Sequence, residues 1–168
     1  MIVVSDTSPL NYLILIGESD LLQRLYGDVV IPPAVHGEFQ HPSTPPLVRQ
    51  WLARPPEWLR IHEPATPPDE LLSRLGPGER EAIVLAEELR ANAILADERD
   101  GRRIAVRRHL TVIGTLQILD SAAESGLIDF PAVLARLQAT TFRVSPRLAA
   151  VFLDRDAQRK RRSRSAED

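Results

Sequence analysis

The sequence predicts a three-layer α/β/α domain with a central parallel sheet of four to five strands. Short apolar runs without polar alternation recur along the chain, which is typical of strands buried on both faces of a parallel sheet. Segments with helical spacing lie between these runs, and such alternation favours a parallel α/β architecture. With 168 residues, 43% of them hydrophobic and 26% charged, the chain suits one domain with a buried core and excludes a disordered or fibrous protein.

The first part of the chain contains signals for two strands and three helices. Residues 2–5 form an apolar run that we expect to be the first strand, and a helix follows over residues 9–16 with proline in its first turn and glycine after its end. A second helix is expected over residues 19–26. Residues 29–31 predict the next strand, and the proline pair that follows begins a helix over residues 32–39.

The middle of the chain is divided by prolines and glycines. Dense prolines over residues 42–68 predict short helices and turns, and the Gly-Pro-Gly sequence at residues 76–78 marks a sharp boundary. Residues 79–89 predict a helix, since small and apolar residues recur at the i, i+3, i+4, i+7 spacing of a buried face. An apolar strand is expected at residues 93–96, with a helix over residues 102–109 after it.

The last part of the chain predicts one more strand and three helices. The strand is expected at residues 112–113 and the helices at residues 115–125, 131–138 and 146–156, the first of them closed by a glycine. We assign residues 1–156 to a single domain.

The remaining twelve residues, 157–168, form a basic segment that we expect to be a disordered tail. They include five basic and two acidic residues, so a net charge of −2 for the whole chain leaves −5 on the residues before them. An acidic body argues against a broad cationic groove, and a nucleic-acid partner would need metal ions or local arginine clusters to offset its phosphates.

Cysteine chemistry and membrane insertion are both excluded. The chain has no cysteine, which rules out disulfides, thiolate zinc sites and cysteine nucleophiles and suits a reducing cytoplasm. No basic leader precedes Asp6, so we expect no signal peptide, and no apolar stretch is long enough to cross a bilayer. The expected location is cytoplasmic, with no membrane partner.

Acidic side chains follow two of the predicted strands. Asp6 comes directly after the first strand, and Asp97 follows the strand at residues 93–96. Ligands bind beyond the carboxyl ends of parallel strands where the strand order switches, so these carboxylates meet at one edge if the two strands are neighbours. Glu79, in the first turn of its helix, and Glu38, in the helix after the second strand, can reach the same edge.

Four carboxylates close together repel one another and are partly protonated unless a cation neutralises them. Oxygen ligands without His or Cys favour Mg²⁺ or Mn²⁺ over zinc. Such ions orient a phosphate, lower the pKa of an attacking water and offset charge on the leaving oxygen. The acidic cluster therefore indicates phosphodiester hydrolysis without a covalent enzyme intermediate.

Four segments in order along the chain resemble the PIN domain family. They are Asp6-Thr7-Ser8 after the first strand, Glu38 behind Ile31-Pro32-Pro33, the stretch Gly78-Glu79-Arg80-Glu81-Ala82-Ile83, and Leu95-Ala96-Asp97-Glu98-Arg99 running into Gly101-Arg102-Arg103. The likeness extends from Met1 to about Leu153. More narrowly, it is to the PIN-like branch of uncharacterised, predicted nucleic-acid-binding proteins.

The resemblance implies a Mg²⁺- or Mn²⁺-dependent ribonuclease, because PIN domains are typically such enzymes and many bacterial members are toxins of toxin–antitoxin pairs. It implies RNA as substrate and an antitoxin protein as partner. The family's acidic quartet matches the catalytic candidates Asp6, Glu38, Glu79 and Asp97. Asp6, Glu79 and Asp97 are the expected metal ligands. The third position is usually Asp in the family and is Glu here, and Glu81 competes with Glu79 for it.

Each candidate also has a structural interpretation. Asp6 can cap the helix that begins near Pro9, and Glu79 can be a first-turn acid that the helix dipole favours. Glu38 can be a solvated helix residue. Thr7 and Ser8 are candidates for binding a phosphate or a metal-linked water, although capping explains either of them equally well. Asp100 is a further acid at the same edge, and Arg102 and Arg103 can contact RNA phosphates.

Two other functions compete with the ribonuclease. The first is a catalytically weak or inactive module of the same fold that binds RNA or a protein partner. The second is a phosphatase-like or phosphoacceptor domain, which the absence of Asp-x-Asp after the first strand disfavours. We also expect a homodimer, for which the late helices offer apolar residues that can equally be core: Leu134, Leu137, Leu148, Val151 and Phe152.

Overall fold

The computed structural model describes residues 1–166, and its packing divides them into two compact units. The first unit is Met1–Thr115 and the second begins at Leu116. The sequence had led us to treat residues 1–156 as one domain. Each unit is described by itself.

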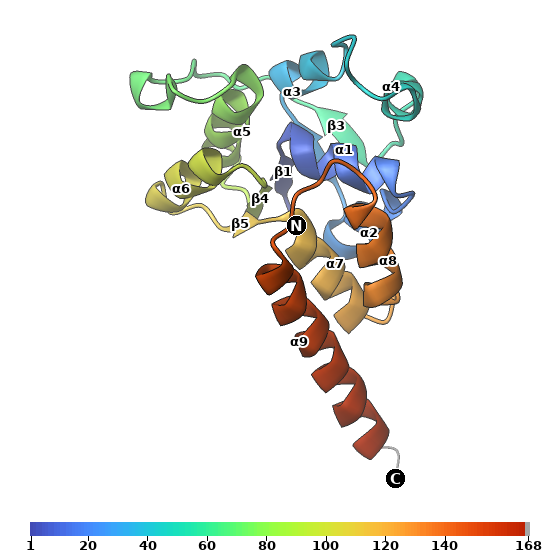
Figure 1. The fold of residues 1–168 in the computed structure, drawn as a ribbon. Helices are drawn as coiled ribbons and strands as arrows, with labels where there is room; N and C mark the ends of the chain where they lie inside the picture. Colours follow the sequence, from blue (N-terminus) through green and yellow to red (C-terminus); the bar gives the residue numbers. More distant parts are fainter. Residues whose placement is uncertain (167–168) are drawn as a thin grey trace. The chain divides into compact units, whose positions relative to one another are not determined.

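The first unit contains a five-stranded sheet in which every pair of neighbours is parallel (Figure 1). Its strands are β1 (Val3–Ser5), β2 (Val29–Ile31), β3 (Leu59–Ile61), β4 (Ala93–Leu95) and β5 (Val112–Ile113). Helices flank the sheet, which confirms the predicted α/β class and the four to five strands. Strand β3 lies in the proline-rich region where the sequence predicted only short helices and turns.

The strand order β3-β2-β1-β4-β5 places the switch point between β1 and β4. From β1 the chain first adds β2 and β3 on one side and then returns to add β4 and β5 on the other. Ser5 pairs with Leu95 at the ends of the two strands, and the N–H of Asp6 donates to the carbonyl of Leu95 at 2.9 Å. The residues that follow β1 and β4 therefore leave the sheet side by side, as the candidate site requires.

Six α-helices and one 3₁₀ helix surround the sheet within the first unit. They are α1 (Thr7–Leu15), α2 (Asp20–Tyr26), α3 (Pro33–Glu38), α4 (Pro46–Ala53), the 3₁₀ helix Glu70–Leu72, α5 (Pro77–Glu88) and α6 (Arg99–Arg107). Three of them, α1, α5 and α6, begin earlier than the sequence predicted. Gly76 and Glu98 occupy the N-cap positions of α5 and α6, with extended backbones, and each helix begins at the next residue.

Helix α5 packs directly against β1, β4 and α3. Its residues Ala82, Ile83 and Ala86 are buried in one core cluster with Val4 of β1 and Ile94 of β4. This confirms the predicted apolar face of the helix. It also determines the direction of the first turn of α5, which carries Glu79 toward the carboxyl ends of the strands.

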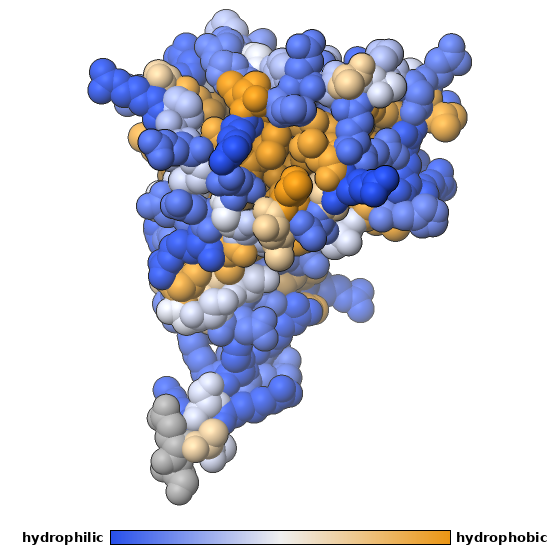
Figure 2. All heavy atoms as spheres, turned by 180° about the vertical axis from the view of Figure 1, so that it is seen from behind, coloured by the Kyte–Doolittle hydropathy of each residue, from blue (hydrophilic) through white to orange (hydrophobic). Residues whose placement is uncertain are grey.

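The β3 side of the sheet is less covered than its centre. All three residues of β1 and of β4 are buried, whereas Arg60 and Ile61 of β3 are exposed. A cavity of about 280 Å³ lies there, lined in part by Ile2, Val30 and Leu89. Apolar side chains gather on the upper part of the face seen in Figure 2.

The second unit is helical, with α7 (Thr115–Glu124), α8 (Phe130–Gln138) and α9 (Pro146–Ser165). The rings of Phe130 and Phe152 stack with centroids 6.1 Å apart. Helix α9 continues through Ser165, so residues 157–165 are helical, whereas the sequence predicted a disordered tail there. Residues 167–168 of that predicted tail lie outside the described residues.

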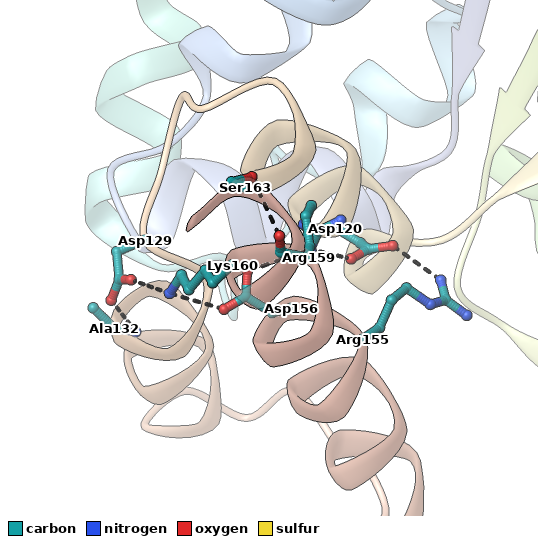
Figure 3. A network of polar contacts seen from close by, with 8 residues as sticks. All are labelled: Asp120, Asp129, Ala132, Arg155, Asp156, Arg159, Lys160 and Ser163. Atoms are coloured by element: carbon teal, nitrogen blue, oxygen red, sulfur yellow. Dashed lines mark hydrogen bonds and ion pairs between the residues drawn. The ribbon is translucent and has the colours of Figure 1, made fainter. Parts of the chain in front are cut away.

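Charged residues on the three helices form one network of ion pairs (Figure 3). Asp120 of α7 pairs with Arg155 and Arg159 of α9, at 2.9 Å each. Asp156 pairs with Arg159 at 3.3 Å and with Lys160 at 2.9 Å. Lys160 also reaches Asp129, the N-cap residue of α8, at 2.8 Å. Basic residues of the predicted tail are therefore part of the packing of this unit.

The apolar residues considered for a dimer interface have different environments. Leu134, Leu137 and Phe152 are buried, while Leu148 and Val151 are exposed. No helix in the described part of the chain is long and apolar enough to cross a membrane.

Candidate active site at the ends of strands β1 and β4

Asp6 is the buried centre of the candidate site. It occupies the N-cap position of α1, yet its side chain makes no capping hydrogen bond to the helix. Only 4% of the residue is exposed, and its Oδ1 atom is buried without a hydrogen-bond partner. A buried polar oxygen is nearly always paired, so this one is suited to a ligand or a proton. The capping interpretation explains the position of Asp6 but not its carboxylate.

Burial raises the pKa of Asp6 from 3.8 to about 7, because desolvation disfavours the charged form. The N–H of Thr7 opposes this shift, while the negative charges of Glu79, Glu38 and Asp97 add to it. The fold therefore brings the four predicted acids within electrostatic range of one another.

Asp97 is held by three donors. Its Oδ1 accepts the N–H of Thr115 at 2.8 Å, and its Oδ2 accepts the hydroxyls of Thr115 at 2.6 Å and Ser8 at 3.0 Å. Thr115 is fully buried. Thr115 is a residue of the candidate site that was not predicted from the sequence. Its position could have indicated it, because Thr115 is a polar residue shortly after the last strand, as Asp6 and Asp97 are after β1 and β4.

Glu38 is held in a similar way at the end of α3. Its Oε1 accepts the N–H of Gly78 at 2.9 Å, and its Oε2 accepts the hydroxyl of Thr7. A side chain at residue 78 would not fit, since a Cβ there would lie 2.8 Å from Cδ of Glu38. Thr7 and Ser8, predicted to bind substrate, thus donate their hydroxyls to two of the acids.

Glu79 and Glu81 point to different parts of the unit. The Oε2 of Glu79 accepts the N–H of Gly76 at 3.1 Å, and burial raises the pKa of Glu79, with Glu98, Glu38 and Asp100 contributing further. Glu81 instead accepts the N–H of Ala34 at 2.9 Å, in the first turn of α3. Of the two, only Glu79 contributes to the pKa shift of Asp6, which favours it as the third acid.

The arginines after Asp97 make no ion pair with the four acids among the described residues. Arg102 donates from Nη1 to the carbonyl of Ala96 at 2.8 Å, and Arg103 is exposed, with Asp100 3.8 Å away. The ion pairs found among the described residues leave Asp6, Glu38, Glu79 and Asp97 without a cationic partner. The edge therefore concentrates negative charge that the protein does not neutralise.

The acids do not form a finished metal site. Within residues 1–166 no group of three or more His, Cys, Asp or Glu side chains is arranged to hold an ion. The reason is visible in the contacts, since the oxygens of Glu38 and Asp97 are turned toward protein donors. A cavity of about 10 Å³ lies beside Asp6, lined by Glu79, Ile83, Ile94, Ala96 and Gly101 as well. The unpaired oxygen and the uncompensated acids fit a cation, whereas the present side-chain orientations do not complete its ligands.

Comparison with known proteins agrees with this architecture. A family model described as a PIN domain matches residues 2–158. A solved structure of a PilT N-terminus domain protein from the hyperthermophilic archaeon Sulfolobus solfataricus is similar, with a TM-score of 0.50 and 18% sequence identity over 86% of this chain and 100% of that one. No curated protein matches the sequence. At 18% identity the solved structure supports the fold alone, and the family match carries the assignment. The chain belongs to the PIN domain family, whose members are typically nucleases.

Proposed function

We propose that this protein is a metal-dependent endoribonuclease that hydrolyses RNA phosphodiester bonds. The observation that carries the proposal is Asp6, a buried carboxylate with an unpaired oxygen, surrounded by three further acids and no cation. Such a cluster calls for a hard cation. Membership of a family of nucleases supports a nucleic-acid substrate.

In this proposal Asp6, Glu79 and Asp97 hold Mg²⁺ or Mn²⁺, and Glu38 completes the acidic quartet. The bound ion would supply charge neutralisation and a lowered pKa for an attacking water. Ser8 and Thr115 hold Asp97 in place, while Thr7 and the N–H of Gly78 hold Glu38. We propose that these hydroxyls hold the acids in the metal-free protein, because each already donates to one of them. Loading requires the carboxylates to turn from their present donors toward Asp6.

The test is Mn²⁺-dependent cleavage of single-stranded and structured RNA by the purified protein. Asp6→Asn should lower the rate at least ~100-fold, since it removes the charge on the central ligand while keeping its shape. Glu79→Gln should have a similar effect. Glu81→Gln is the matched control and should retain activity, because Glu81 contacts the backbone of α3. If neither RNA is cut with Mn²⁺ and Asp6→Asn changes nothing, the proposal is wrong.

One observation favours a second candidate, a PIN-like module without catalysis that binds RNA or a protein partner. Among residues 1–166 the acids are not arranged as a ready metal site. Calorimetric titration separates the two candidates. Binding of Mg²⁺ or Mn²⁺ supports the nuclease, whereas no binding together with RNA binding supports the inactive module.

We further propose that the enzyme is the toxin of a toxin–antitoxin pair, with an antitoxin protein as its partner. This rests on the family resemblance. Expression of the wild-type protein in a host without the antitoxin should arrest growth, and expression of Asp6→Asn should not. Equal growth with both proteins at equal levels would contradict the toxin role and leave the nuclease to be tested in vitro.

A homodimer is proposed as well, with Leu148 and Val151 of α9 as the exposed apolar residues available for contact. Light scattering measures the mass in solution. A dimeric mass that Val151→Glu reduces to that of a monomer would support this interface, and a monomeric wild-type protein would exclude it.

A further inference from the structure

Gly101 in α6 is a glycine that its own backbone does not require. It lies inside the helix and is not among the residues with positive φ. Glycine within a helix costs about 1 kcal/mol relative to alanine, so its presence calls for another reason. Close approach of another group is the usual one.

The group that approaches Gly101 is the carboxylate of Glu79. A Cβ added at residue 101 would overlap Oε1 of Glu79 and would lie 3.3 Å from its Cδ and 3.8 Å from its Cγ. The three atoms nearest to that position all belong to this one side chain. The helix therefore offers a bare surface on which the end of Glu79 rests.

The same glycine borders the space beside Asp6. The cavity of about 10 Å³ is lined by Asp6, Glu79 and Gly101 together with three apolar residues of the core. This volume is about that of one water-sized sphere. A side chain at residue 101 would push Glu79 out of its present place beside this space.

We propose that Gly101 is a positioning residue for Glu79, whose carboxylate reaches its place near Asp6 only because residue 101 lacks a side chain. Residues 79 and 101 thus act as a pair, since the longer arm of glutamate needs the space that glycine leaves. The inference rests on the proposed metal-dependent function. It adds a residue from α6 to a site otherwise formed by acids and their donors.

Substitution of Gly101 should displace Glu79 without unfolding the protein. The overlapping atoms are the far end of a flexible side chain, which can turn away. Alanine is also more favourable than glycine inside a helix, so the substitution should not destabilise α6 itself. Gly37 is the matched control, because it also lies in a helix with ordinary φ and a Cβ there would have no neighbour within 4 Å.

The experiment is calorimetric titration of Mn²⁺ into the full chain and into Gly101→Ala, Glu79→Asp, the double variant and Gly37→Ala. Circular dichroism and Tm in EDTA verify the fold. Gly101→Ala should weaken Mn²⁺ binding ~10-fold and Gly37→Ala should leave it unchanged. In the Glu79→Asp background the shorter arm avoids the new methyl group, so adding Gly101→Ala should change the Kd by less than ~3-fold. Such non-additivity is what direct contact predicts.

Each contrary titration result contradicts a different part of the proposal. If the wild-type protein binds no Mn²⁺, the proposed function fails and the inference fails with it. If the wild-type protein binds Mn²⁺ and Gly101→Ala binds equally well, the inference alone is wrong. If Gly101→Ala weakens binding to the same extent in both backgrounds, the residue does not act through Glu79 and the inference is again overturned.

Discussion

Asp6 in the first unit and Asp156 in the second are both buried aspartates, 4% and 3% exposed, with opposite surroundings. Asp156 lies between Arg159 and Lys160 in the network shown in Figure 3. Asp6 has three acids around it and one oxygen without a partner. The protein neutralises one carboxylate with its own cations and leaves the other to a proton or an external cation.

The difference gives a physical criterion that distinguishes a carboxylate with a structural role from one that is a candidate for a functional role. A buried acid with matched basic partners contributes to the packing of its helices, and removing it takes one ion-pair partner from each of those cations. A buried acid among other acids destabilises the metal-free fold, and perturbed groups of this kind are concentrated at functional sites. The two aspartates should therefore respond in opposite directions to the same substitution.

The largest effect on stability is expected for Asp156→Asn. It removes one of the two carboxylates that pair with Arg159 and one of the two that pair with Lys160. With two charge-assisted contacts of a buried carboxylate lost, the free energy of unfolding should fall by about 3 kcal/mol. Urea denaturation followed by circular dichroism measures the change. A loss below about 0.5 kcal/mol would mean that the network contributes no more than an exposed salt bridge. Asp156 would then not be a stabilising residue that contrasts with Asp6.

The opposite sign is expected for Asp6→Asn in EDTA at pH 8. In the wild type, ionising Asp6 with a pKa near 7 rather than 3.8 destabilises the folded state by about 4 kcal/mol. The variant avoids this cost, but its buried, unpaired amide destabilises the folded state by about 2 kcal/mol. The free energy of unfolding of the variant should therefore be about 2 kcal/mol higher than that of the wild type. Destabilisation by a similar amount would show that Asp6 is a structural residue like Asp156.

The difference in unfolding free energy between the wild type and Asp6→Asn should depend on pH. Between about pH 4 and pH 7 the folded protein keeps a proton on Asp6 that the unfolded chain has lost, so wild-type stability falls as pH rises through this range. The Asn variant lacks this contribution. In EDTA the variant should be less stable than the wild type at pH 4 by about 2 kcal/mol, because only the cost of the unpaired amide remains there. It should become the more stable of the two as the pH rises toward 7, and the difference should stay level above that pH. Thermal unfolding of both proteins at several pH values measures the trend, and a constant difference would contradict the raised pKa of Asp6.

Added Mn²⁺ should make the wild type more stable than Asp6→Asn, which reverses their order in EDTA. At a hundred times its Kd the ion should stabilise the wild type by about 2.7 kcal/mol, because it binds only the folded state. This exceeds the advantage of about 2 kcal/mol that Asp6→Asn has in EDTA. Asp6→Asn should gain much less, and Asp156→Asn should gain as much as the wild type. Equal shifts in all three proteins would indicate binding elsewhere on the chain.

The smallest effect is expected at the exposed end of α9. Arg161→Gln should change the unfolding free energy by less than about 0.5 kcal/mol, because Arg161 is exposed and outside the network. Arg159→Gln in the same helix should cost more, since it contacts both Asp120 and Asp156. Similar values for the two arginines would show that the network adds little to the packing of the helices.

Much of the site could be predicted because it depends on strand ends. Buried strands are short apolar runs, and an acid after two of these runs is visible in the sequence, which is why Asp6 and Asp97 could be predicted as a pair. Glu79 was preferred to Glu81 by its position relative to the apolar face of one helix. In the structure Glu81 accepts the N–H of Ala34 at 2.9 Å, away from Asp6, and the choice of Glu79 stays a prediction.

What the sequence determined by itself is local: the buried strands, the apolar face of α5, and the acids at the ends of β1 and β4. Periodicity and strand-end position depend on neighbours in the chain, so a single sequence contains them. Strand β3, the contact of Thr115 with Asp97 and the space that Gly101 leaves for Glu79 depend on residues brought together by the strand order. Only the tertiary structure decides which side chains meet there, because hydrogen bonds and close approaches between distant segments leave no periodic signal in the chain.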